Sequence, residues 1–423
     1  MNHLDLKYEK YKLQNGLQVI LHKADKPQLV AVNIWYKVGS AYEVKGKTGL
    51  AHLFEHMMFQ GSENVPKEMH FKYIQEAGGS LNASTAFDRT NFYEKLPSNY
   101  LELALWLESD RMGYFLPALT QEKLNNQIDV VKNERLERYD NQPYGLAWEI
   151  LLSNLYPVDH PYNSSTIGSI TDISSFTLDD VTSFFKKQYS PGNASLVIAG
   201  NFELRQAKDL IEKYFSEIPD LSDSKIPSTK NNYLKENKFF IHYDKVQLER
   251  IYFVWSSVSS FHEDEAALIV LANILTDSKK SRLYNSLVYE KEIAQDVSAY
   301  NFSGKFGGHF MIAATVKPGH SADEIKNEIL NEIKNISNSS VSEKELLKAK
   351  NILKSLFIFS LQRLEHLADM INSYNFYLDE PNSLGHDLKR FTSLKTSDIK
   401  SSTDKFLTKP FFELRIVPED NRK

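Results

Sequence analysis

The amino-acid sequence repeats itself once, and this duplication limits the possible folds more than any other feature. Segments of the first half recur in the same order in the second half. Thus "LVAVNIWYKVGSAYE" corresponds to "LERIYFVWSSVSSFHED". At a constant offset, "TQEKLNNQIDVVKNER" corresponds to "SEKELLKAKNILKSLF". The closing segments "FTLDDVTSFFKKQYSPGNASLVIAG" and "LKTSDIKSSTDKFLTKPFFELRIVPE" also correspond. The shared order predicts two tandem copies of one unit of about 200 residues, which is a normal domain size.

Each copy combines strand-like and helix-like segments. "KYKLQNGLQVILHK" alternates around an Asn-Gly turn and is typical of a hairpin. The fold class is therefore α+β, with two homologous α/β units that carry helices on mixed, mainly antiparallel sheets. The polar stretch 219–237 has no periodic pattern of apolar residues, which indicates a linker. We expect a first domain at 1–218 and a second at 238–423.

Composition excludes several functional classes. The net charge of −5 gives no electrostatic case for nucleic-acid binding. The sequence contains no cysteine, so disulfides, thiolate metal sites and cysteine nucleophiles are excluded, and a metal must be held by His, Asp or Glu. No apolar run is long enough to predict a transmembrane helix, and the N-terminus has no signal-peptide core. The expected compartment is the cytoplasm, or the periplasm if an export signal has been removed.

The stretch "GLAHLFEHMMFQGS", residues 49–62, carries the strongest chemical signal. Residues four apart lie on one face of a helix, so His52 and His56 can bind one ion. Glu55 lies on the edge of the same face, where a carboxylate can take a proton from a metal-activated water. The spacing is the H-x-x-E-H signature of inverzincin zinc peptidases. The alternative is that these are polar residues on an ordinary helix.

The second copy acts as an internal control for this motif. It builds the corresponding helix with different residues opposite His52, Glu55 and His56, which are Ile269, Ala272 and Asn273. The polar residues are therefore not needed for the fold. For a third ligand we favour Glu134, which follows two valines on an amphipathic helix. Its counterpart is Leu356, so this position is expected to face inwards. Glu137, one turn later, is the rival, although a solvated helix face explains it better.

These motifs together resemble the pitrilysin/insulysin family of zinc metallopeptidases, in the bacterial branch that is similar to mitochondrial processing peptidase. The resemblance rests on "HLFEH", "VVKNE", "GGSLNASTAFDRTNFYEKL", "YDNQPYG" and the two tandem units, and it covers nearly the whole chain. It implies one Zn²⁺ per chain, with His52, His56 and Glu134 as ligands and Glu55 as the general base. It also implies that "GGSLNASTAF" is an edge strand where Asn82 and Ala83 contact the substrate backbone.

The sequence departs from the family pattern in two places. Many members carry a glutamate seven residues before the third ligand, where this chain has Gln127. We interpret Gln127, like Glu137, as at most a neighbour that orients a ligand. Complete relatives also place an Arg and a Tyr, seven residues apart, in the second domain, where this chain has Val288 and Gln295. Arg282 and Tyr284 lie too early for those roles, and packing or surface contacts explain them better.

The leading hypothesis is a zinc-dependent endopeptidase whose two units face each other across a cavity and act on unfolded peptides. Because the Arg/Tyr pair is missing, we expect a heterodimer with a similar chain that carries the pair, and otherwise a homodimer. One alternative is a peptide-binding or scaffold subunit that holds zinc but has little activity alone. A purely structural zinc site is a weaker alternative, since the second copy folds without a metal motif.

Overall fold

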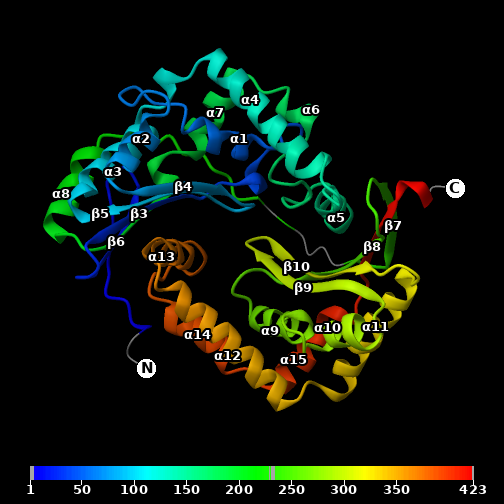
Figure 1. Ribbon diagram of the computed structural model, residues 1–423. Helices are drawn as coiled ribbons and strands as arrows, with labels where there is room; N and C mark the ends of the chain where they lie inside the picture. Colours follow the sequence, from blue (N-terminus) through cyan, green and yellow to red (C-terminus); the bar gives the residue numbers. More distant parts are fainter. Residues whose placement is uncertain (1–3, 228, 230–233, 422–423) are drawn as a thin grey trace. The chain divides into compact units, whose positions relative to one another are not determined.

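The chain forms two compact units, and each unit is assembled from both halves of the sequence (Figure 1). The computed structural model describes residues 4–227, 229 and 234–421. Unit 1 comprises Met1–Arg135, Ser164–Ser228 and Ile358–Gly385. Unit 2 comprises Leu136–Asn163, Thr229–Phe357 and His386–Lys423. A division at the linker 219–237 would place 136–163 in the first domain and 358–385 in the second, whereas 136–163 belongs to unit 2 and 358–385 to unit 1. Residues 228 and 230–233 of that linker lie outside the described residues.

Unit 1 contains a six-stranded sheet with strand order β1-β2-β6-β3-β5-β4. The predicted hairpin is confirmed, because β1 and β2 pair antiparallel around the Asn-Gly turn. The strands are β1 (Glu9–Lys12), β2 (Gln18–Lys23), β3 (Leu29–Tyr36), β4 (Ser80–Thr85), β5 (Thr90–Pro97) and β6 (Ala194–Gly200). The helices are α1 (Leu50–Met57), α2 (Met69–Glu76), α3 (Leu101–Gly113), α4 (Gln121–Arg135), α6 (Ile170–Ile173), α7 (Leu178–Gln188), α8 (Leu204–Phe215) and α13 (Leu364–Leu378).

Unit 2 contains a five-stranded sheet with strand order β7-β11-β8-β10-β9. Its strands are β7 (Lys238–Asp244), β8 (Arg250–Ser257), β9 (Ala294–Gly304), β10 (Gly307–Val316) and β11 (Phe412–Pro418). The helices are α5 (Ala147–Leu155), α9 (Glu265–Thr276), α10 (Arg282–Tyr284), α11 (Ala322–Ser339) and α15 (Thr396–Ser402). Two further helices, α12 (Glu343–Ser360) and α14 (Leu384–Thr392), run across the boundaries between the units.

The two sheets confirm the internal repeat and the α+β class. Strands β2-β6-β3-β5-β4 of unit 1 correspond in order to β7-β11-β8-β10-β9 of unit 2. In both sheets the first two of these strands pair parallel and the remaining neighbours pair antiparallel. Only β1 has no counterpart in the described part of unit 2. The sheets are therefore mixed and mainly antiparallel, as the sequence predicted.

Helix α13, from the second half of the sequence, packs on the sheet of unit 1 (orange in Figure 1). Its apolar residues Ala368 and Ile371 join a buried cluster with Ile20, Ala31, Val197 and Ala199 of the strands. Side chains at three-residue intervals along the helix then bond to the sheet. The amide of Asn372 donates to the carbonyl oxygen of Asn33 at 3.0 Å, and Asp369 accepts from the indole N–H of Trp35 at 2.7 Å.

Helix α5, from the first half, packs in the reciprocal way on the sheet of unit 2. The hydroxyl of Tyr156, which ends α5, lies 3.0 Å from Nδ1 of the buried His309 on β10. The ring of Trp148 contacts the same imidazole, with centroids 5.2 Å apart. Burial lowers the pKa of His309 to about 3, so this side chain is neutral in the folded protein.

Within the described residues, no helix is both long enough and apolar enough to span a membrane.

Candidate metal centre

Helix α1 carries the histidine pair, and its start is fixed by an acidic side chain six residues upstream. The carboxylate of Glu43 accepts the backbone N–H groups of Gly49 at 2.9 Å and Ala51 at 2.7 Å. These donors belong to the first turn of the helix, which has no intrahelical partner for them. Gly49 has φ = +90°, and a Cβ there would lie 2.5 Å from the carbonyl oxygen of Ile167. Glycine is therefore required on steric grounds as well as by its backbone conformation.

The opposite side of α1 is anchored in an aromatic cluster. The ring of Phe54 is fully buried and stacks on Tyr189 and Phe185, with centroids 4.4 Å and 5.7 Å apart. Phe115 contacts the same ring at 5.3 Å. Because aromatic side chains bury large areas and lose few rotamers, this packing sets the rotation of α1 and hence the direction of its polar face.

The structure brings together three side chains that could hold a metal. One ligand atom each of His52, His56 and Glu134 lies within 4.8 Å of the others. Oε2 of Glu134 is 3.2 Å from Nε2 of His56 and 3.9 Å from Nε2 of His52. The imidazole rings are 4.9 Å apart and nearly perpendicular. Two imidazole nitrogens and one carboxylate oxygen are a common ligand set of catalytic zinc, so the residues fit that ion.

Glu55 lies beside this group on α1, and a residue of β4 holds its carboxylate. Oγ1 of Thr85 donates a hydrogen bond of 2.6 Å to Oε2 of Glu55. Burial raises the pKa of Glu55, while this hydrogen bond and the neighbouring His56 oppose the rise. A carboxylate with a raised pKa is a better proton acceptor near neutral pH. No sequence pattern points to Thr85 or Glu43, because both act through contacts that only the fold creates.

The third candidate ligand comes from the last turn of α4. Glu134 is only 15% exposed at its side chain, whereas Glu137 is exposed in the π-helix Leu136–Asp140 that follows. Helices that widen into a π turn are frequent at functional sites. Gln127 is buried on α4, two turns before Glu134. Among the described residues, Glu137 does not belong to the group of ligand atoms.

The expectation that Leu356 faces inwards is wrong, because this side chain is 58% exposed. The buried residues of α12 are Leu346 and Ala349, in the first half of the helix. The later part of α12 therefore runs past the core of its unit. The repeat gives the correct position of the helix but not the burial of each residue on it.

Strand β4, which contains Asn82 and Ala83, is the last strand of the unit 1 sheet. It pairs antiparallel with β5, where Asn82 lies opposite Tyr93 and Ala83 opposite Phe92. Asn82 is exposed, and its side-chain oxygen accepts the N–H of Ala83 at 2.9 Å. Since Thr85 of the same strand holds Glu55, this edge lies directly beside the candidate metal centre.

A second buried group of ligand type, His70, Glu94 and Glu108, has a different character. The guanidinium of Arg111 binds Glu108 and lies 3.5 Å from Glu94, and its carbon is 4.1 Å from the ring centre of Phe92. Nε2 of His70 is 3.1 Å from Glu94. The permanent positive charge of Arg111 compensates the negative charge of the two carboxylates, so no metal ion is needed between them. We interpret this group as structural.

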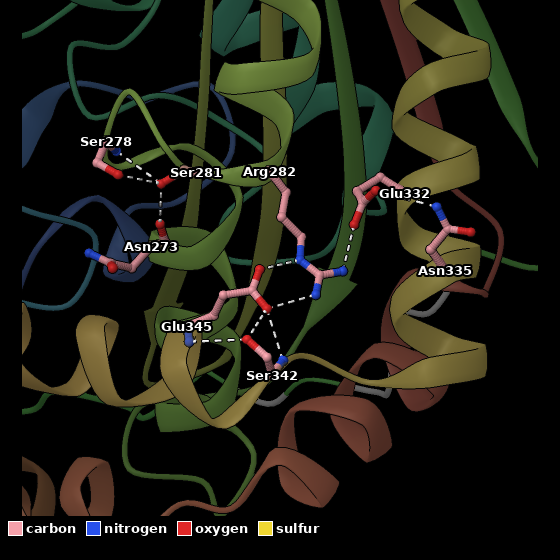
Figure 2. Close-up of polar contacts among 8 residues, drawn as sticks. All are labelled: Asn273, Ser278, Ser281, Arg282, Glu332, Asn335, Ser342 and Glu345. Carbon is pink, nitrogen blue, oxygen red and sulfur yellow. Dashed lines mark hydrogen bonds and ion pairs between the residues drawn. The ribbon is translucent and has the colours of Figure 1, made fainter.

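Arg282 is also structural, which agrees with its interpretation from the sequence (Figure 2). Its guanidinium binds Glu345 through two nitrogens at 2.6 and 2.9 Å, and Glu332 at 2.8 Å. These contacts fasten α10 to α11 and α12 within unit 2. Val288 packs against the core of unit 2, and Gln295 is exposed on β9. Neither can provide the positive charge of an arginine.

Comparisons with known proteins give matches along most of the chain. Residues 18–168 match the family model of insulinase, peptidase family M16, and residues 175–353 match that of the peptidase M16 inactive domain. The chain is 30% identical over 400 residues to the zinc protease PqqE of Helicobacter pylori, covering 93% of this chain and 88% of that protein. It is 22% identical over 409 residues to a probable mitochondrial-processing peptidase subunit beta of Arabidopsis thaliana, covering 93% and 75% of the two chains.

The fold also matches solved structures along its whole length. A crystal structure of a protease from Helicobacter pylori has a TM-score of 0.92 at 28% identity, covering 98% of this chain and 100% of that chain. A peptidase M16 inactive domain from Pseudomonas fluorescens has a TM-score of 0.85 at 18% identity, covering 98% of both, and so supports the fold alone. The residues of the candidate metal centre all lie within the segment that matches the insulinase model.

Proposed function

Because this chain belongs to the M16 family of peptidases, we propose that it is a zinc-dependent endopeptidase that cleaves extended, unfolded peptides. The observation that carries the proposal is the convergence of His52, His56 and Glu134, with Glu55 beside them. A purely structural metal site does not require a further carboxylate next to its ligands, whereas a hydrolytic site needs a proton acceptor there.

His52, His56 and Glu134 would hold the ion through Nε2, Nε2 and a carboxylate oxygen. Bound there, zinc supplies Lewis acidity that polarises the scissile carbonyl and makes water acidic near neutral pH. With these three side chains as its protein ligands, a zinc ion would still be able to bind water or substrate. The aromatic packing of Phe54 and the cap by Glu43 keep the two imidazoles in place, so little ordering is required when the ion binds.

Glu55 takes the proton of the attacking water on its carboxylate and then donates it to the amine that leaves. The hydrogen bond from Thr85 fixes Oε2, so the other oxygen, Oε1, is the atom that we assign to proton transfer. The same residue must act first as base and then as acid, and a carboxyl with a raised pKa is suited to both steps.

The substrate is an extended segment that adds to the edge strand β4. Main-chain hydrogen bonds to an edge depend little on side chains, which favours unfolded peptides and broad sequence preference. Asn82 and Ala83 would contact the substrate backbone, since they lie on the strand whose Thr85 binds the base. Cleavage would then fall at a fixed distance along the bound peptide, beside Glu55.

Val288 and Gln295 support the proposal that a second, similar chain completes the enzyme. Neither residue can stabilise a developing oxyanion as an Arg and a Tyr hydroxyl can, a contribution of about 3 kcal/mol. Two similar proteins are named as beta subunits of mitochondrial-processing peptidases. We propose a partner chain that carries the Arg/Tyr pair, with a homodimer as the next possibility.

The same observation supports a second candidate function. A chain that holds zinc and binds peptide at β4, but lacks the oxyanion donors, would serve as a binding subunit with little activity of its own. The deciding experiment measures zinc content and the cleavage of an unstructured fluorogenic peptide by the purified chain, alone and with any similar chain encoded nearby. Zinc without cleavage in every combination would favour the binding subunit, and absence of zinc would overturn both proposals.

A further inference from the structure

The sheet of unit 2 ends on β7 (Figure 1). Three apolar side chains of this edge strand are exposed. Phe239, Phe240 and Ile241 are 56%, 42% and 39% exposed. Natural proteins protect edge strands with charged residues, bulges or a covering segment, because an open edge is a template for another strand. The guanidinium of Arg415 on the neighbouring β11 lies over the ring of Phe239, 5.4 Å from its centre, but the described residues place no further strand beside this run of three apolar residues.

The main chain of β7 is arranged to accept another strand. β7 pairs parallel with β11, and the N–H of Lys238 donates to the carbonyl oxygen of Phe411 at 3.0 Å. Hydrogen-bonding direction alternates along a strand, so Phe240 also directs its N–H and C=O towards β11. Phe239 and Ile241 therefore direct theirs towards the open side.

The internal repeat shows what this position can hold. Strand β2 is the counterpart of β7, since it pairs parallel with β6 as β7 does with β11. In unit 1, β1 covers the outer side of β2 as an antiparallel strand, with Glu9 opposite Leu21 and Lys12 opposite Gln18. The described residues place no strand at the same position beside β7. The fold thus accepts an antiparallel strand at this edge, and unit 2 lacks one.

We propose that a second copy of this chain fills this position, by pairing its β7 antiparallel to β7 around a twofold axis at Ile241. The strand KFFIHYD is self-complementary in that register. Lys238 lies opposite Asp244 of the second copy, and Asp244 opposite its Lys238. Phe239 lies opposite Tyr243, and Phe240 opposite His242. Opposite charges and aromatic pairs across neighbouring strands stabilise their pairing.

The two charged residues remain able to make these contacts. Lys238 is exposed and uses one donor, to the carbonyl oxygen of Asn154 at 2.8 Å, which leaves two of its N–H donors. Each oxygen of Asp244 accepts one backbone N–H, from Tyr144 and from Lys245, and a carboxylate oxygen can accept two. A parallel arrangement would instead place Lys238 opposite Lys238, which is repulsive. The charges therefore select the antiparallel register.

The contact predicts a weak dimer. A strand of seven residues buries less surface than the roughly 1,200 Å² of a stable interface, so association should depend on concentration in the micromolar range. The proposal concerns unit 2 alone and does not depend on the proposed enzyme activity. A dimer that forms through β7 should also form in a Glu134→Gln variant that has lost the metal.

The experiment is sedimentation velocity over a concentration series of the full chain. Ile241→Pro removes an N–H that points away from β11, so the fold should survive, since proline is tolerated on the open side of an edge strand. We expect this variant to weaken association at least about tenfold, because the central hydrogen bonds are lost. Ile241→Val is the matched control and should associate like the natural chain. Circular dichroism checks that each variant is folded.

Charge exchange tests the register. Lys238→Asp and Asp244→Lys should each weaken self-association, because like charges then face each other twice. An equimolar mixture of the two variants restores both opposite-charge pairs and should recover the dimer. The proposal would be overturned by any of three results. The natural chain stays monomeric at about 100 μM, Ile241→Pro associates as strongly as the natural chain, or the mixture of the two charge variants does not form the dimer.

Discussion

At the scale of single residues, the candidate metal centre consists of side chains whose positions come from two helices and a strand. His52 and His56 are set by helical geometry, while Glu134 and Thr85 reach them only in the folded chain. Each has a separable role, which makes substitution informative. Substitutions of Glu134 and Glu55 therefore distinguish a metal ligand from a general base.

Glu134→Gln should lose bound zinc. The amide oxygen is a poorer ligand than a carboxylate and carries no charge, so we expect zinc affinity to fall at least about 100-fold. The measurement is zinc content by elemental analysis after dialysis against a weak chelator. Glu137→Gln is the matched control, since it removes an exposed glutamate one turn later, and it should keep its metal. Full zinc occupancy in Glu134→Gln would refute the ligand assignment.

Glu55→Gln should keep zinc and peptide binding but lose cleavage. Glutamine can still accept the hydrogen bond from Thr85, yet it cannot take a proton, so kcat should fall by about 10²–10⁴. Turnover of an unstructured peptide and fluorescence anisotropy of peptide binding separate the two effects. Loss of zinc in stoichiometric amounts would instead identify Glu55 as a ligand.

At the scale of elements, helices exchanged between the halves of the sequence hold each unit together. Helix α13 bonds to the unit 1 sheet through Asp369 and Asn372, and α5 contacts the unit 2 sheet through Trp148 and Tyr156. Each helix covers apolar sheet surface that the other half of the sequence leaves open. Neither half is therefore expected to fold into a complete unit without the other half.

The contact between α5 and His309 predicts a pH dependence of stability. The pKa of His309 is lowered from 6.5 to about 3 by burial, so below pH 6.5 the unfolded chain binds a proton that the folded chain excludes. This contribution is fully favourable above pH 6.5 and is lost as the pH falls towards 3. Between pH 7 and pH 5 the loss is on the order of 2 kcal/mol.

His309→Phe should remove that part of the pH dependence. The variant loses the contact with Tyr156, so it should be about 1 kcal/mol less stable at pH 7. Its deficit relative to the natural chain should then shrink or reverse at pH 5. Urea unfolding followed by tryptophan fluorescence measures both, because Trp148 lies against this imidazole. An exposed control, His386→Phe, should keep the natural slope; the same slope in His309→Phe would contradict the assignment.

At the scale of the whole molecule, the chain carries residues that fit a zinc ion, whereas Val288 and Gln295 cannot serve as a cationic oxyanion donor pair. The two units share a topology, and the candidate ligands His52, His56 and Glu134 come together in unit 1. Val288 and Gln295 take the places of the Arg and Tyr that the family resemblance leads us to expect. Activity of the isolated chain should therefore be low, and a partner that supplies the pair should raise it.

The double variant Val288→Arg/Gln295→Tyr tests this division of labour. If only the oxyanion donors are missing, peptide cleavage by the chain alone should rise at least about tenfold. Val288→Leu/Gln295→Phe is the matched control, because it keeps similar bulk without charge or hydroxyl, and it should show no gain. Thermal unfolding checks that the arginine is tolerated where Val288 packs on the core. Full activity of the natural chain alone, with no gain from any partner, would refute the idea.

The sequence by itself determined the features that depend on local spacing or on repetition. The i, i+4 histidines define one helix face, the Asn-Gly turn defines the hairpin, and the duplicated order of segments defines two units of one topology. Each of these follows from backbone geometry within a few residues, or from a second copy of the same pattern.

Only the tertiary structure decided which distant segments meet. Segments 136–163 and 358–385 are exchanged between the units. Thr85 donates a hydrogen bond to Glu55, and Glu43 caps α1. All these contacts join residues that share no local sequence pattern. The exposure of Leu356 shows the same limit, because burial depends on where the core of a unit ends and not on the repeat alone. Side-chain contacts across such separations are selected by packing of whole elements, which no short window of sequence contains.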